Sequence, residues 1–177
     1  MGTDDPIGDL AKLLAASGAR MVIAPERLAP SAIYDVDYRA AVVACAFQLH
    51  AMPYGQDRAR ISVPRLKLLQ FMAIRPWLLP VLRLWAASRA QPQLNSLAEK
   101  RMRRGFMSDH LHDDVVDFFN AANIFLREGD HIVSGPEIGR ARQLYDDACE
   151  QELFIGERKA LEVLKGIRVT HAMLEGW

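Results

Sequence analysis

The chain has 177 residues, of which 50% are hydrophobic and 25% are charged, and its formal net charge is zero. This composition is that of an ordinary globular protein, and it excludes an intrinsically disordered chain, a collagen-like chain and a disulfide-rich scaffold. A chain of this length can form one domain with a substantial core. The zero net charge by itself argues against a polyanionic partner, but the distribution of charge along the chain changes that conclusion.

Charge is distributed unevenly along the chain. Residues 1–55 carry a net charge of −2, residues 56–108 carry eleven bases and two acids for a net charge of +9, and residues 109–177 carry seven bases and 14 acids for a net charge of −7. Such asymmetry bears on partners or on internal pairing rather than on fold. Either the basic and acidic parts neutralise each other within the molecule, or the basic part meets an anionic partner.

Helices in the first half of the chain are predicted from apolar spacing and from capping and stop residues. Residues 5–17 form a helix that ends at Gly18, and residues 21–24 form a short strand or an extended arm. The other predictions for this half are a buried helix from a cap at Ser31 or Asp35 to about His50, a helix between Ser62 and Arg75, a helix at 76–90 and a polar connector at 91–107.

The segment from Ser108 onward carries the clearest pattern. Ser108 or Asp109 caps a helix to about Ala122, and two short apolar runs around Gly129-Asp130 then predict a β-hairpin over 124–134. Residues 134–137 have the pattern of a capping box for a further helix, and a last helix is expected at 157–165. The apolar stripe of the first of these helices comprises Leu111, Val115, Phe118, Phe119 and Ala122.

These elements predict a mainly α-helical fold with one small β-hairpin, in a single compact unit of three parts. The parts are an N-terminal helical segment at 1–55, a core at 56–135 and C-terminal helices at 136–177 that pack on the core. The N-terminus has no positively charged and apolar signal pattern, and the longest clean apolar run, residues 40–47, is far shorter than the about 20 residues that span a bilayer. Cys45 and Cys149 are predicted to be buried free thiols, and we expect a cytoplasmic protein.

The run DDVVDFFNAANIFLREGDHIVSG at 113–135, preceded by helices, resembles a winged-helix domain, in which a helix-turn-helix is followed by a hairpin wing. The resemblance covers residues 60–135 and implies a winged-helix core flanked by N-terminal and C-terminal helices. It carries no catalytic residues. The connector expected at 91–107 departs from the tight turn that normally joins the second and third helices.

The order of an N-terminal helical segment, such a core and a C-terminal helical pair is also similar to the small middle subunits of bacterial three-component ATPase defence systems of the Lamassu kind. The segments VVDFFNAANIFLREGD and RVTHAMLEGW contribute to this similarity. It implies an adaptor that bridges an SMC-like ATPase and an effector in antiviral defence.

A DNA-reading winged helix places the outward face of its third helix in the major groove. In this chain that face presents Asp113, Asp114 and Asp117, whose carboxylates would be repelled by phosphates. Arg127 in the wing is offset by neighbouring acids. We therefore predict that this helix does not read DNA and that Asp113, Asp114, Asp117 and Arg127 bind a protein partner, as winged helices that have lost DNA reading often do.

A compact basic patch lies in the expected connector and consists of Lys100, Arg101, Arg103 and Arg104. It could contact a nucleic-acid backbone without sequence preference. It could also dock on an acidic face of a partner, or on the acidic helix of its own chain. The sequence leaves these three interpretations open.

Residues 109–114, Asp-His-Leu-His-Asp-Asp, contain residue types that bind metals, and His110 and Asp114 share one helix face. An acidic first turn, which is favourable at a helix N-terminus, explains the same residues. The chain has no nucleophile elbow, phosphate loop or Cys-His metal spacing. We therefore expect no catalytic residues, no metal and no cofactor, and a small metal-dependent hydrolase is the remaining enzyme alternative.

Taken together, the sequence predicts a non-catalytic adaptor subunit that works by protein–protein interaction in a multiprotein complex. The alternative is a winged-helix DNA-binding transcriptional regulator that contacts DNA through the basic patch.

Overall fold

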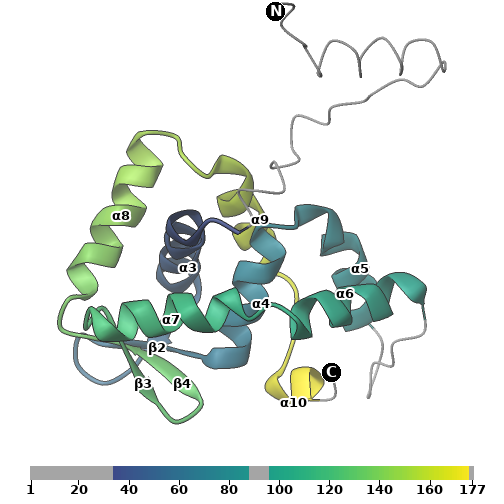
Figure 1. Ribbon diagram of the computed structural model, residues 1–177, viewed down its shortest axis with the longest axis horizontal. Helices are drawn as coiled ribbons and strands as arrows, with labels where there is room; N and C mark the ends of the chain where they lie inside the picture. The colour runs from purple at the N-terminus through teal and green to yellow at the C-terminus, as the bar shows by residue number, and fades with distance from the viewer. Residues whose placement is uncertain (1–33, 88–95, 176–177) are drawn as a thin grey trace, which may run out of the picture.

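The structure is a computed structural model that describes residues 34–87 and 96–175. Helices make up most of this part of the chain, and a small antiparallel sheet lies at one edge of them, beside α7 (Figure 1). The mainly α-helical fold that the sequence predicts is therefore confirmed, although the sheet is larger than a single hairpin. The predictions for residues 5–17 and 21–24 lie outside the described residues.

The sheet joins strands from two distant parts of the chain. Its strands are β1 (Met52–Pro53), β2 (Ala59–Ser62), β3 (Phe125–Glu128) and β4 (His131–Ser134), in the order β1-β2-β4-β3, and each neighbouring pair is antiparallel. The predicted hairpin is confirmed as β3–β4, and its turn contains Gly129 at a φ of 60°, which glycine adopts readily because it has no Cβ. The sequence did not predict β2, which holds the hairpin in place through backbone pairing with β4.

Helix α3 (Val36–His50) lies at the centre of the helical layer, and residues 41–47 of this helix are all buried. It packs against α4 (Val63–Ala73), α7 (Leu111–Ala121), α8 (Ile138–Glu150) and α9 (Ile155–Lys165). Burial on every side explains its Ala/Val-rich sequence, because a helix that is apolar all round belongs in a core. The core cluster draws residues from all three parts of the chain that the sequence divides at 55 and 135.

The predicted polar connector at 91–107 is wrong for most of its length. After η1 (Pro76–Leu78) and α5 (Leu79–Ala86), residues Leu97–Met107 form helix α6. A capping box starts it: the Ser96 side chain accepts from Glu99 N, and the Glu99 carboxylate accepts from Ser96 N at 2.7 Å. Met102 and Phe106 are buried, and Phe106 meets the ring of Phe71 edge-on with 5.7 Å between centroids. Because basic residues surround Met102 and Phe106 in the sequence, the segment has the composition of a polar connector and its apolar helix face is not evident.

Helix α7 has a different start and a different buried face from those predicted. It begins at Leu111 without a side-chain cap, because the Asp109 carboxylate binds arginines instead. His112 and Val116 are buried, whereas Phe118, which the predicted stripe included, is 57% exposed. The rotation follows from a polar contact, since the buried His112 Nδ1 donates to Gln70 Oε1 on α4.

The predicted capping box at 134–137 does not form. Helix α8 starts after Glu137 with no side-chain capping bond, and the Ser134 hydroxyl instead accepts from Ala59 N at 2.7 Å across the sheet. The expected helix at 157–165 is confirmed as α9, and a short helix, α10 (His171–Glu175), follows it. Cys45 and Cys149 are free thiols; Cys45 is buried, which raises the pKa of its thiol to about 11, and Cys149 is half-buried. Within the described residues, no helix has the length and apolar character needed to span a bilayer.

Candidate interaction site

The outward side of α7 combines carboxylates with an exposed aromatic ring. We call Asp113, Asp114, Asp117 and Phe118 the α7 face; all four side chains are exposed. Asp113 Oδ2 lies 3.7 Å from Lys67 Nζ of α4. Asp114 and Asp117 form no ion pair with any residue of the described part of the chain. The face therefore has two unpaired negative charges beside an apolar ring.

Two buried polar contacts fix the position of α7. Asp109 Oδ1 lies 2.6 Å from Arg39 Nη1, and its Oδ2 lies 3.4 Å from Arg75 Nη1, at the junction of α6 and α7. In the first turn of α7, His112 bonds to Gln70, and its burial, aided by nearby Lys67, lowers the pKa of His112 to about 3. A neutral imidazole then donates through Nδ1. These contacts hold α7 against α3 and α4 with its acidic side outward.

Arg127, predicted to act with the three aspartates, is exposed on β3. Glu128, one of the acids expected to offset it, instead accepts from Arg58 Nη2 at 2.7 Å. Among residues 34–87 and 96–175, Arg127 forms no ion pair. The structure thus leaves the charge of Arg127 unpaired and places it on the strand that follows the α7 face in the chain.

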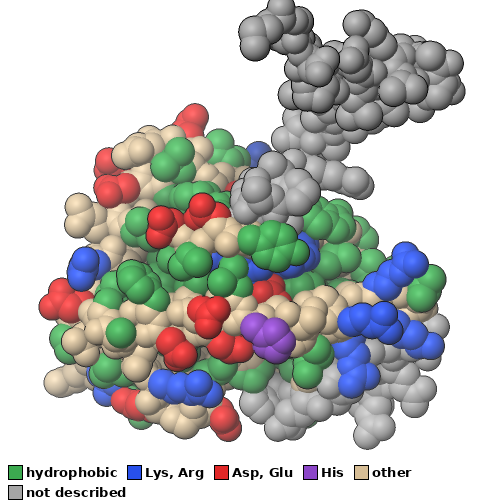
Figure 2. All heavy atoms as spheres, in the orientation of Figure 1, with side chains coloured by type: hydrophobic (Ala, Val, Ile, Leu, Met, Phe, Trp, Pro, Cys, Tyr) green, Lys and Arg blue, Asp and Glu red, His purple; other side chains and the backbone are tan. Residues whose placement is uncertain are grey.

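The basic patch lies on helix α6 and not in a connector. All four side chains are exposed; Lys100 and Arg104 lie opposite the buried Met102 and Phe106, and Arg101 and Arg103 lie on the two flanks. Figure 2 shows basic side chains over α6 and acidic side chains over α7 on one face of the molecule. In the parts of the chain that the structure describes, no ion pair joins the patch to an acid, and the acids at 109, 113 and 128 pair with Arg39, Lys67, Arg75 and Arg58. The α6 patch is therefore open to solvent.

The candidate metal ligands do not form a cluster. No group of three or more His, Cys, Asp or Glu side chains with metal-binding geometry is present among the described residues. His110 is exposed at the start of α7, whereas His112 is buried and bonds to Gln70.

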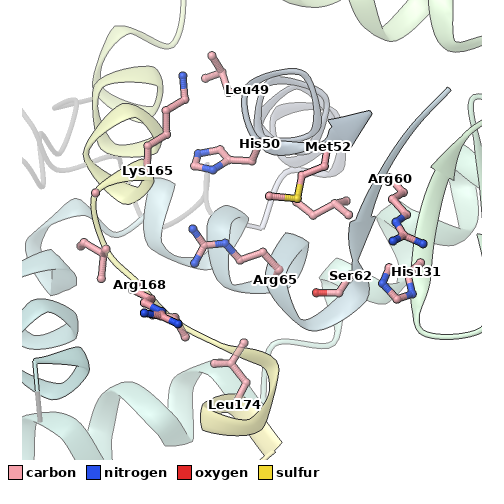
Figure 3. Close-up of a pocket in the computed structure, with 14 residues that line it drawn as sticks. Leu49, His50, Met52, Arg60, Ser62, Arg65, His131, Lys165, Arg168 and Leu174 are labelled. Carbon is pink, nitrogen blue, oxygen red and sulfur yellow. The ribbon is translucent and has the colours of Figure 1, made fainter. Parts of the chain in front are cut away.

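A basic cavity that the sequence analysis did not identify lies between the C-terminal ends of α3 and α9 and strand β2 (Figure 3). Its volume is about 640 Å³. Among the described residues that line it there is no Asp or Glu; the ionisable ones are His50, Arg60, Arg65, His131, Lys165 and Arg168. These residues come from positions 50 to 168 and form no local motif, so only the fold brings them together.

Comparison of the chain with protein-family models, with curated proteins and with solved structures finds no match.

Proposed function

We propose that this protein is a non-catalytic adaptor subunit built on a winged-helix core, and that it binds a protein partner through the α7 face. The observation that carries the proposal is the exposed Phe118 ring beside the unpaired carboxylates of Asp114 and Asp117. An exposed aromatic residue is typical of the centre of protein–protein contacts. The neighbouring carboxylates select a partner surface that is basic and apolar, since complementary charge gives specificity.

The order of elements supports the winged-helix assignment. In this proposal α4, rather than the helix expected at 76–90, takes the position of the second helix and α7 that of the third, and the β3–β4 hairpin directly follows α7, as a wing does. The pairing of β2 with β4 anchors this hairpin to the core. The chain departs from the pattern because η1, α5 and α6 separate α4 from α7.

The acidic outward side of α7 also supports an adaptor over a DNA reader. A recognition helix approaches phosphates closely, and the potential from Asp113, Asp114 and Asp117 would oppose that approach. In this proposal the partner is an SMC-like ATPase, as the similarity to the Lamassu-type middle subunits implies, and the adaptor connects it to an effector in bacterial defence.

The proposal is tested by purifying the full-length tagged protein from its native host. We expect a stoichiometric protein partner, which the charge-reversal variant Asp114→Lys/Asp117→Lys loses. The matched control, Asp146→Lys/Asp147→Lys, makes the same charge change at two exposed positions of α8 and should retain the partner. A chain that purifies without a partner, or a face variant that keeps its partner, contradicts the proposal.

The second candidate, a DNA-binding regulator, is favoured by one observation: the α6 patch has four exposed bases without ion pairs to the described residues. Such a patch would bind DNA through phosphates, with an affinity that falls steeply as salt increases. Substitution of all four bases by Gln should abolish the binding. If the wild-type chain does not shift DNA even at low salt, this candidate is excluded.

A further inference from the structure

Most of the positive charge in the basic cavity has no acidic partner among the described residues. Arg60 and Arg168 form no ion pair within residues 34–87 and 96–175, and Lys165 pairs only with Glu162 of its own helix, which is not a lining residue. His50 donates through Nε2 to Leu161 O at 2.9 Å, and burial, together with nearby Arg65 and Lys165, lowers its pKa. A concave site with several cations and no lining carboxylate favours an anion.

Arg65 is the central residue of this cavity. Its Nη2 donates to Leu164 O at 3.2 Å, but its Nη1 is buried and has no hydrogen-bond partner in the described structure. No described carboxylate pairs with it, and desolvation lowers the pKa of its guanidinium. A partly buried guanidinium that has a buried N–H group without a hydrogen-bond acceptor is unfavourable. A bound anion would remove that cost, so the unpaired charge points to a ligand.

The start of α4 adds to the positive potential. Ser62, the N-cap residue of this helix, lines the cavity and makes no side-chain capping bond. The N-terminal end of a helix carries a partial positive charge. Val63 N donates to Asp130 O and Pro64 has no N–H, so the start of α4 contributes through this dipole rather than through free amides. The start of α4 and the Arg65 side chain, which lies one turn further along, therefore both favour a bound anion.

The remainder of the cavity is apolar. Leu49, Met52, Ile61, Ile167, Val169 and Leu174 contribute side chains to it. Figure 3 shows Met52 between the His50–Arg65 side and the Arg60–His131 side, with Leu174 on the edge below. A volume of about 640 Å³ lies within the range of small-molecule sites. The ligand that fits has a compact anionic group and an uncharged apolar or aromatic part.

We propose that the basic cavity binds a small phosphate-bearing molecule of mononucleotide size, with its phosphate at Arg65 and its apolar or aromatic part against Met52 and Leu174. A phosphate dianion matches the several unpaired cations better than a carboxylate monoanion does, and a guanidinium can bind two of its oxygens. This site is separate from the α7 face and does not depend on the adaptor proposal.

Calorimetric titration of the full-length protein with adenosine monophosphate, inorganic phosphate and adenosine tests this proposal. We expect adenosine monophosphate to bind more tightly than inorganic phosphate, and adenosine not to bind. Arg65→Gln should weaken the binding roughly tenfold or more, since a charge-assisted contact is lost. Arg168→Gln, at an exposed lining residue, should also weaken the binding of adenosine monophosphate. This variant tests the proposal if Arg65→Gln does not fold.

Arg142→Gln is the matched control, because Arg142 is exposed on α8 and does not line the cavity. This variant should bind adenosine monophosphate with the affinity of the wild type. The NMR titration of His50 gives an independent readout, since a bound anion should raise the pKa of this histidine. The proposal is overturned if adenosine binds as tightly as adenosine monophosphate, or if adenosine monophosphate does not bind. It is also overturned if the cavity variants bind adenosine monophosphate as tightly as the Arg142→Gln control. Tighter, Arg65-dependent binding of a short single-stranded oligonucleotide also overturns it, because the ligand would then be a nucleic acid.

Discussion

The guanidinium of Arg39 and the carboxylate of Asp109 form a buried ion pair, with 2.6 Å between Nη1 and Oδ1. It joins the first turn of α3 to the middle of the α6–α7 junction, 70 positions later in the chain. Arg75 Nη1 lies 3.4 Å from the other carboxylate oxygen, so one carboxylate balances two guanidinium groups. The pair positions α7 and therefore the face that we propose as the interaction site.

Asp109→Asn should lower the free energy of unfolding by about 3 kcal/mol or more, because it removes the buried carboxylate that Arg39 and Arg75 share. The control is Glu162→Gln, which removes the exposed ion pair with Lys165 and should cost under about 1 kcal/mol. Urea unfolding of both variants measures the difference. Equal effects of the two substitutions would show that the buried pair does not fix α7.

Stability should also depend on the protonation of His112. Its pKa is about 3 in the folded state and about 6.5 when unfolded, so the unfolded chain binds the proton first as the pH falls. The stability contributed by the neutral imidazole is therefore complete above pH 6.5 and is lost between pH 6.5 and 3, by up to about 1.4 kcal/mol per pH unit.

His112→Asn retains an amide donor toward Gln70 and removes the titration. Its free energy of unfolding should change less steeply over this pH window than that of the wild type, as followed by urea unfolding at several pH values. Parallel pH profiles for the two proteins would exclude His112 as a source of acid sensitivity.

Some properties of α7 can be predicted from the sequence and others cannot. Its existence and the acidic outward positions were predictable from spacing and charge, and the following hairpin from Gly129-Asp130. Which face of α7 is buried could not be predicted, because Phe118 is more apolar than His112. Only the partner Gln70 on α4 makes burial of the histidine favourable. A contact between positions 42 residues apart leaves no local signal.

Helix α6 and strand β2 were missed for different reasons. Ser96 and Glu99 are a capping-box pair, and this signal could have revealed α6, but the run of bases after it favoured a connector. Strand β2 has one buried residue, Ile61, and its pairing with β4 involves positions about 70 residues away, so no periodicity marks it. The basic cavity depends on β2 and on the end of α9, and could not be predicted without them.

The capping box of α6 gives a direct test of that helix. Ser96→Ala should destabilise the protein by about 1 kcal/mol and reduce its helical circular dichroism, because the Glu99 N–H loses its acceptor. Ser108→Ala, at the other end of α6, removes only the hydroxyl contact with Gly105 O and should have a smaller effect. A larger effect at Ser108 would contradict the capping assignment.

Gly135 follows β4 and lies against the backbone before β3. A Cβ at this position would meet Asn123 O at 2.2 Å, so Gly135→Ala should destabilise the protein by about 1–3 kcal/mol through forced backbone movement. At Gly139 in α8 a Cβ would meet nothing within 4 Å, and Gly139→Ala should be stabilising by up to about 1 kcal/mol. Thermal unfolding should therefore shift in opposite directions, and shifts of the same sign would contradict the hairpin geometry.

Site-specific photo-crosslinking tests the partner role of the α7 face most directly. A photoreactive phenylalanine analogue replaces Phe118 in the full-length protein in its native host, and a second protein carries the analogue at Leu144, an exposed position on α8. The account predicts a discrete protein adduct from position 118 and none from position 144. Adducts of equal yield from both positions, adducts with nucleic acid from position 118, or no adduct there would contradict it.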